Sequence, residues 1–105
     1  MIIKIALSKD KMNVQEIIEI RTSKSLQAQV EKLLQDLIED IQGDSENTGA
    51  KLFQRMNFEV DFTFQINIDS RDISSEGSKL GQRVATIMKE HGIVNHSIWK
   101  ELDGK

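Results

Sequence analysis

The chain is 105 residues long, 38% hydrophobic and mildly acidic with a net charge of −3, which suits one compact domain spanning residues 1–105. It contains no cysteine, so disulfides, thiolate metal sites and cysteine nucleophiles are excluded. Its N-terminus lacks the apolar length of a secretion signal or a membrane span, so we expect a cytoplasmic protein that does not enter the membrane.

Two segments near the N-terminus have the pattern of strands. In residues 2–8, the large apolar side chains of Ile3, Ile5 and Leu7 recur at every second position, which predicts a first strand. Residues 14–22 are ambiguous, because Val14, Ile17 and Ile18 have helical spacing, whereas the β-branched composition of the segment favours a strand. We interpret this second segment as a strand, which predicts an N-terminal β-hairpin.

A long amphipathic helix is predicted to follow. Apolar residues recur at spacings of three and four over about four to five turns, namely Leu26, Val30, Leu33, Leu34, Leu37, Ile38 and Ile41. Ser23 or Ser25 can cap its first turn, and Gly43 suits its C-terminal end. Residues 44–49 then form a polar loop, and residues 50–56 are predicted to add a helical turn.

The segment 58–69 alternates strictly between apolar and polar residues. Its apolar positions are Phe58, Val60, Phe62, Phe64, Ile66 and Ile68. Because side chains of a strand point alternately to its two faces, one face needs a covering layer and the other can face water. The segment is therefore predicted to be a strand at the centre of the core.

The segment that follows this strand is predicted to be helical. The apolar positions of a second amphipathic helix are Leu80, Val84, Ile87 and Met88. Its candidate caps are Asp72, Ser74 and Ser75, and it is predicted to end near Gly92. Residues 95–102 are then predicted to form a last short helix.

These elements predict a two-layer α+β fold. A small, mainly antiparallel sheet, formed by the N-terminal hairpin and the long strand 58–69, is covered on one face by the two amphipathic helices. In a sheet of so few strands, an edge of the long strand would stay unpaired. Pairing of such edges between two chains would cover them, which predicts a homodimer.

An acidic surface is the predicted binding site. Residues 26–78 contain four bases and eleven acids, a net charge of −7. The candidate partner-binding residues are Asp36, Glu39, Asp40 and Asp44. Such a run is ordinarily a solvated helix face, and the sharper interpretation is a surface that docks a basic partner protein.

A second candidate site lies in residues 81–102, which resemble a helix-turn-helix with Gly92 at the turn. The candidate nucleic-acid-binding residues are Asn95, His96 and Lys100, which would face the DNA, and Lys79 and Arg83, which would contact phosphates. Against this interpretation, Met88 stands where such motifs carry a small residue, and any helical corner with a glycine has the same spacing.

The remaining motifs give no positive sign of catalysis. Residues 77–81 contain two glycines but lack the residue order of a phosphate loop, so we expect them to let a helix approach the sheet closely. His91 and His96 are separated by the helix-breaking Gly92, so neither a metal site nor a cofactor is predicted.

The sequence therefore predicts a small, non-catalytic protein-binding or regulatory module that uses an acidic surface and forms a homodimer. The alternative is a DNA-binding regulator that acts through residues 81–102. A hydrolytic or metal-dependent enzyme ranks third, because no nucleophile elbow, zinc-ligand or dinucleotide motif is present.

Overall fold

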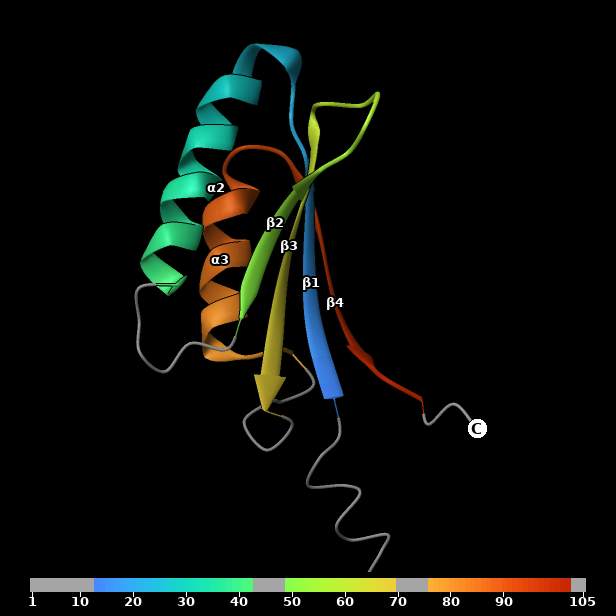
Figure 1. The fold of residues 1–105 in the computed structure, drawn as a ribbon. Helices are drawn as coiled ribbons and strands as arrows, with labels where there is room; N and C mark the ends of the chain where they lie inside the picture. The colour runs from blue at the N-terminus through green and yellow to red at the C-terminus, as the bar shows by residue number, and fades with distance from the viewer. Residues whose placement is uncertain (1–12, 43–48, 70–75, 103–105) are drawn as a thin grey trace, which may run out of the picture.

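The computed structural model describes residues 13–42, 49–69 and 76–102. Within them, the elements in chain order are β1 (Asn13–Arg21), the short helix η1 (Lys24–Leu26), α2 (Gln27–Gln42), β2 (Ala50–Gln54), β3 (Asp61–Asp69), α3 (Lys79–Lys89) and β4 (Ile93–Lys100). Figure 1 shows both long helices on one side of a single sheet. None of the described helices has the length and apolar character needed to cross a membrane.

The described strands are all antiparallel and follow the order β2-β3-β1-β4 across the sheet (Figure 1). The central strands β1 and β3 pair along their full lengths, from Asn13 opposite Asp69 to Arg21 opposite Asp61. The β-α-β-β-α-β order of elements is that of the ferredoxin-like motif. The predicted two-layer α+β fold with a mainly antiparallel sheet is confirmed, and the sheet has four strands among the described residues.

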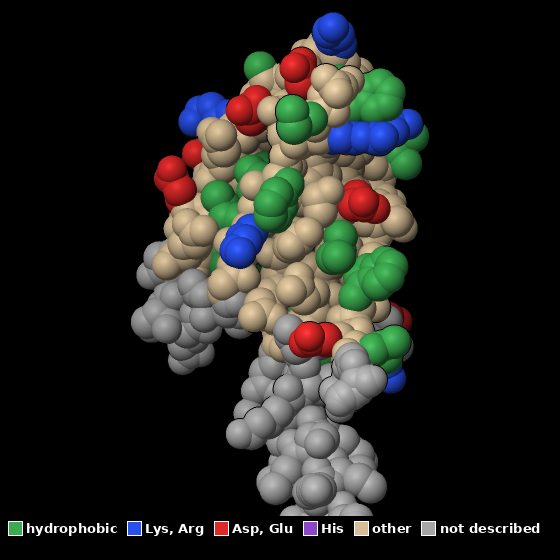
Figure 2. Space-filling view, turned by 45° about the vertical axis from the view of Figure 1, so that its right-hand side comes forward, with side chains coloured by type: hydrophobic (Ala, Val, Ile, Leu, Met, Phe, Trp, Pro, Cys, Tyr) green, Lys and Arg blue, Asp and Glu red, His purple; other side chains and the backbone are tan. Residues whose placement is uncertain are grey.

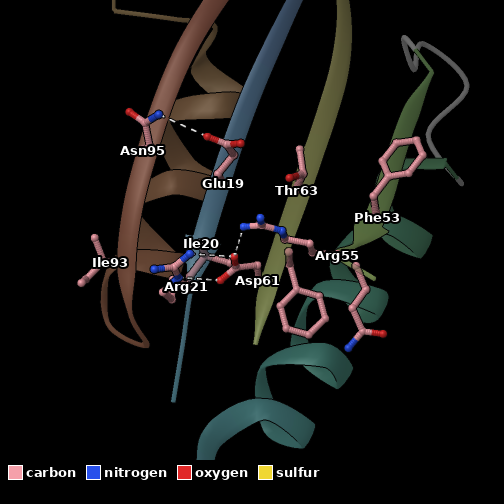
Figure 3. Close-up of a pocket in the computed structure, with 11 residues that line it drawn as sticks. Glu19, Ile20, Arg21, Phe53, Arg55, Asp61, Thr63, Ile93 and Asn95 are labelled. Atoms are coloured by element: carbon pink, nitrogen blue, oxygen red, sulfur yellow. Dashed lines mark hydrogen bonds and ion pairs between the residues drawn. The ribbon is translucent and has the colours of Figure 1, made fainter. Parts of the chain in front are cut away.

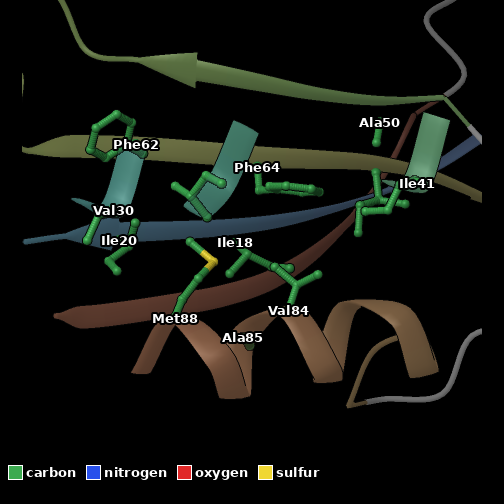
Figure 4. Close-up of a cluster of buried hydrophobic side chains, with 12 residues drawn as sticks. Ile18, Ile20, Val30, Ile41, Ala50, Phe62, Phe64, Val84, Ala85 and Met88 are labelled. Atoms are coloured by element: carbon green, nitrogen blue, oxygen red, sulfur yellow. The ribbon is translucent and has the colours of Figure 1, made fainter. Parts of the chain in front are cut away.

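The core lies between the sheet and the two helices (Figure 4). Alternate residues of the central strands point toward the helices, and Ile18, Phe62 and Phe64 are at most 2% exposed. They pack with buried residues of both helices, namely Val30, Leu34, Ile41, Val84, Ala85 and Met88. The intervening strand residues lie on the opposite face, which neither helix covers (Figure 1).

Both long helices occupy segments that were predicted to be helical. Ser23 caps the first of them through η1, with its side-chain oxygen 3.3 Å from the Leu26 amide nitrogen. α3 begins after Ser78, whose side-chain oxygen accepts a 2.9 Å hydrogen bond from the Gly81 amide. The predicted caps at residues 72–75 are therefore wrong.

β1 confirms the choice of strand over helix for its segment. The hairpin partner predicted at residues 2–8 lies outside the described residues. β1 is paired on one side with β3 and on the other with β4 over nearly its whole length. Neither edge of β1 is therefore available to a hairpin partner.

Two segments that were predicted to be helical are strands. Residues 50–54 form β2, in which Leu52 lies opposite Phe64 of β3. Residues 93–100 form β4 in place of the predicted short helix at 95–102. In both segments the spacing of the apolar residues does not distinguish helix from strand. The backbone groups of the central strands decide the outcome by offering hydrogen-bond ladders.

The central strand begins later than predicted. The chain turns before it, with the Phe58 amide bonded to the Arg55 carbonyl and Asn57 in the left-handed region at φ 70°. β3 therefore starts at Asp61, and Phe58 is 52% exposed instead of buried. Because β3 lies between β1 and β2, both of its edges are paired, and the unpaired edge on which the predicted homodimer rested does not exist.

Candidate functional site

The uncovered face of the sheet combines charged, amide and apolar side chains. Strand register places Thr63 opposite Phe53 on one side and Glu19 on the other. Glu19 in turn lies opposite Asn95, whose Nδ2 donates a 3.2 Å hydrogen bond to Glu19 Oε1. This row of side chains crosses the whole sheet from β2 to β4 (Figure 3).

Asp61 is the polar centre of this face. Arg21, directly opposite it on β1, donates from Nε to Oδ1 at 2.8 Å and from Nη2 to Oδ2 at 3.0 Å. Arg55, which follows β2, donates from Nη1 to Oδ2 at 3.2 Å. The centroid of the Phe58 ring lies 4.7 Å from Arg55 Cζ and 5.8 Å from Arg21 Cζ. One carboxylate thus orients two guanidinium groups that come from different parts of the chain (Figure 3).

These side chains border a hollow of about 450 Å³. Figure 3 shows Ile93 at one margin and Phe53 at the other, with the Asp61 cluster between them. Ile93 is 77% and Phe53 48% exposed. The hollow offers apolar contact at its margins and guanidinium donors at its centre, so it suits a partner that carries both apolar and anionic groups.

The Asp61 cluster makes stability depend on pH in the acid range. Hydrogen bonding to Arg21, supported by Arg55, holds the pKa of the Asp61 carboxyl below its usual 3.8. A carboxylate whose pKa is lower in the folded state stabilises that state above its unfolded pKa, and this stabilisation is lost as the pH falls below about 4. We therefore expect Asp61→Asn to be less stable than the parent protein at neutral pH and to lose less stability on acidification. Urea unfolding at a series of pH values measures both effects. If Asp61→Asn lost as much stability as the parent protein on acidification, the expectation would be contradicted.

Exposed apolar side chains gather on this face and around its margins. Among the described residues, the large apolar side chains with at least 48% of their surface exposed are Phe53, Met56, Phe58, Ile93, Trp99 and Leu102. In the described part of the chain, these residues belong to strands β2 and β4, to the turn before β3 and to the end of β4, and none lies on α2 or α3. Figure 2 shows hydrophobic groups on this side interspersed with charged ones. Such gathering is typical of an interaction surface.

A second polar cluster lies on the other face of the sheet, beneath the start of α3. Glu16 of β1 is completely buried, and its carboxyl accepts hydrogen bonds from Ser78 Oγ at 2.5 Å and from the Ser78 amide at 3.2 Å. His96 Nε2 of β4 lies 2.5 Å from Glu16 Oε2. Gly77 and Gly81 leave space for this carboxyl, because a Cβ at either position would collide with it.

This contact explains the paired glycines of residues 77–81. They let the helix start approach the sheet closely, as predicted, and the buried carboxyl of Glu16 is the group that needs the space. The first turn of a helix can hold an anion through its amide groups. Here the position is taken by the protein's own side chain, so we interpret the cluster as part of the scaffold.

The acidic candidates share one exposed helix face. Asp36, Glu39 and Asp40 are exposed on α2, within about one turn of one another. Asp44 lies outside the described residues. Lys32 Nζ lies 3.5 Å from Asp36 Oδ2, so part of this negative charge is compensated.

The segment 81–102 is not a helix-turn-helix. α3 ends at Lys89, and residues 93–100 continue as β4, with Lys100 paired opposite Val14 of β1. A helix-turn-helix reads DNA with its second helix, and a strand stands in that place here. The interpretation of this segment as a helix-turn-helix is therefore wrong.

The residues that were assigned to nucleic-acid binding do not form one surface. Lys79 and Arg83 are exposed on α3. Asn95 lies on the uncovered sheet face, whereas its neighbour His96 points to the opposite side and contacts Glu16. Successive side chains of a strand point to opposite faces of the sheet, so Asn95 and His96 are separated here, whereas a recognition helix would have placed them together.

The contacts around Asp61 were not predicted from the sequence. Arg21 and Asp61 are 40 residues apart in the chain, and no local pattern indicates that strand register pairs them. The alternation of the segment 58–69 did assign Asp61 to a polar face. Phe53 gave no usable signal, because its segment was interpreted as a helical turn.

The fold and this face define a small α+β domain with an open amphipathic sheet surface. No family model matches the chain, and no curated protein and no solved structure matches it. A fold shared by many activities does not identify one of them, so the function is inferred from the geometry of the site.

Proposed function

We propose that this chain is a small, non-catalytic protein-binding module whose partner binds on the uncovered face of the sheet. The observation that carries the proposal is the position of the exposed large apolar side chains, because Phe53, Ile93 and Trp99 lie on this face and none of them lies on the described helices. The bound segment carries an acidic side chain beside apolar ones.

The exposure of the charged groups supports an acidic segment. The side chain of Asp61 is 17% exposed, whereas those of Arg21 and Arg55 are 60% and 57% exposed. An approaching partner would therefore meet guanidinium groups before it met the carboxylate. The guanidinium N–H groups of Arg21 and Arg55 that do not bond to Asp61 can bind a second carboxylate. Asp61 already holds the planes of both guanidinium groups in place.

The uncovered face is a better candidate than the acidic face of α2. Binding energy at interfaces comes mainly from a few buried aromatic and arginine anchors. On the sheet face, Phe53 and Arg55 are an aromatic residue and an arginine that a bound partner would bury. The described part of α2 exposes no large apolar side chain beside Asp36, Glu39 and Asp40.

Single-stranded nucleic acid fits this face less well. Sheets that bind single-stranded RNA stack its bases on aromatic side chains. The described positions of β1 and β3 on the uncovered face carry no aromatic residue. Without aromatic residues at these positions, the central strands offer no platform on which bases could stack.

Titration of isotope-labelled protein with designed peptides tests the proposal. One series of peptides places Asp or Glu beside Phe or Leu, and a matched series replaces the acid by Lys. We expect the acidic series to shift the amide NMR signals of Arg21, Phe53 and Ile93, with little change along α2. The Arg55→Ala variant should bind the best peptide about tenfold more weakly, a loss of ~1.4 kcal/mol.

Arg83→Ala is the matched control, because Arg83 is an exposed arginine on α3 outside the proposed surface. This variant should bind the peptide as the parent protein does. Preference for the lysine series, with signal changes centred on Asp36 and Asp40, would transfer the site to the acidic helix face. Tighter binding of a single-stranded oligonucleotide than of any peptide would contradict the protein-binding function.

A further inference from the structure

β4 is an edge strand without the features that usually protect an edge. Its inner side pairs with β1, and no strand among residues 13–42, 49–69 and 76–102 lies on its outer side (Figure 1). Its 8 residues include no glycine and no proline, and the one charged residue is the terminal Lys100. The other edge strand, β2, has 5 residues and exposes Lys51. Because protected edges are short, charged or interrupted, β4 is the edge that is open to pairing within the part of the chain that the structure describes.

Apolar side chains on both faces of β4 remain accessible. Ile93 and Trp99 are 77% and 60% exposed on the uncovered sheet face. Val94 and Ile98 are only partly buried on the helix side. A strand added to this edge would cover these side chains with its own and would satisfy the open backbone groups.

The residue pattern of β4 is symmetrical about His96. From either end, residues 93–99 run apolar, apolar, polar, polar, polar, apolar, apolar. In an antiparallel pair related by a two-fold axis, residues equally far from the axis lie opposite one another. With His96 on the axis, the opposed pairs from the two copies are Ile93 with Trp99, Val94 with Ile98 and Asn95 with Ser97.

Neighbouring registers lose this match. An axis at Ser97 places Val94 opposite Lys100 of the second copy, and an axis at Asn95 places Ile93 opposite Ser97. Apolar pairs across neighbouring strands stabilise a sheet, and a shift in register breaks them. A strand that matches itself in one register is a specific fit for a second copy of the same strand.

We propose that two copies of this chain pair antiparallel through β4, with His96 at the two-fold axis. Opposed residues of an antiparallel pair point to the same face, so the two sheets continue into one and both uncovered faces lie on the same side. Trp99 of the second copy then stands beside Ile93, which lines the hollow around Asp61. The second copy thus adds an aromatic wall to that hollow.

Sedimentation velocity across micromolar concentrations tests the dimer. We expect a species of about 24 kDa, twice the 12.0 kDa of the chain. Trp99 is the single tryptophan of the chain, so its emission should shift to shorter wavelength in step with dimer formation. Ile93→Lys should sediment as a monomer under the same conditions while its circular dichroism spectrum stays that of the parent protein.

A charge exchange tests the register. Ile93→Lys combined with Trp99→Glu places an introduced lysine opposite an introduced glutamate at two points of the proposed dimer. Within one strand the two positions are about 20 Å apart, too far to pair with each other. We expect this double variant to form dimers at concentrations where Ile93→Lys alone does not. Ile93→Lys with Trp99→Lys is the matched control and should stay monomeric.

Three results would overturn the proposal. A parent protein that is monomeric at every concentration would show that the edge is not paired between copies. A dimer that survives both Ile93→Lys and Trp99→Lys would place the interface elsewhere. Failure of the charge exchange to restore a dimer would exclude the register centred on His96. Peptide binding by Arg55→Ala is measured separately, so failure of the dimer is distinguishable from failure of the proposed function.

Discussion

Replacing Phe64 by alanine is expected to lower the free energy of unfolding by about 3–5 kcal/mol. Phe64 is completely buried, with Ile18 of β1 opposite it on one side and Leu52 of β2 on the other. Truncation removes the burial of the ring and leaves a cavity, because the packed neighbours collapse only in part. Urea unfolding followed by circular dichroism measures the loss.

Thr63→Ala is the matched control on the same strand. Thr63 lies next to Phe64 but points to the uncovered face. Removal of its side chain creates no core cavity, and we expect a change within about 0.5 kcal/mol. A loss as large as that of Phe64→Ala would mean that both faces of β3 are covered in solution, which contradicts the two-layer architecture.

Gly81→Ala is expected to destabilise the protein by about 2 kcal/mol or more, although alanine favours a helix over glycine by about 1 kcal/mol. The added Cβ would collide with the carboxyl of Glu16, which is buried and held by Ser78 and His96. Relief requires the helix to move away from the sheet or the carboxyl to leave its hydrogen bonds, and both are costly in a packed core. The urea concentration at the midpoint of unfolding falls if Gly81→Ala destabilises the protein and rises if it stabilises it.

Making the same substitution in a second variant, Glu16→Ala, identifies the cause of this loss of stability. In the Glu16→Ala variant the carboxyl is absent, so the further change Gly81→Ala should be neutral or stabilising. Thr86→Ala, at an exposed position of α3, controls for alanine in this helix and should change stability little. Equal losses from Gly81→Ala in both backgrounds would show that contact with Glu16 is not the reason.

The long elements could be predicted because their patterns are long. Helical spacing persists through α2, and the alternation of Phe62, Phe64 and Ile66 persists through β3, so each pattern fits one period only. β2 has 5 residues, and in β4 two pairs of adjacent apolar residues flank three polar ones, so neither segment alternates regularly. Such patterns fit the helical period of about 3.6 residues as well as the strand period of two. Both segments were therefore interpreted as helical.

The candidate site could be predicted only in part. Asp36, Glu39 and Asp40 were chosen because they belong to a run of acidic residues, and the structure shows that all three are exposed on α2. Contact of Arg21 with Asp61 depends on the register of two strands, which no local pattern contains. Register follows from the whole set of apolar pairs across the sheet.

The order of residues determined by itself that this chain has one covered sheet face and two amphipathic helices, because periodicity is a property of neighbouring residues. Only the tertiary structure decided which strands pair, which side chains meet on the uncovered face and which of the described strands lie at the edges of the sheet. These outcomes follow from completing the hydrogen bonds of β1 and β3 on both sides, and β2 and β4 supplied the missing partners. The same pairing that built the core left Arg21, Arg55 and Asp61 together on the face opposite the helices.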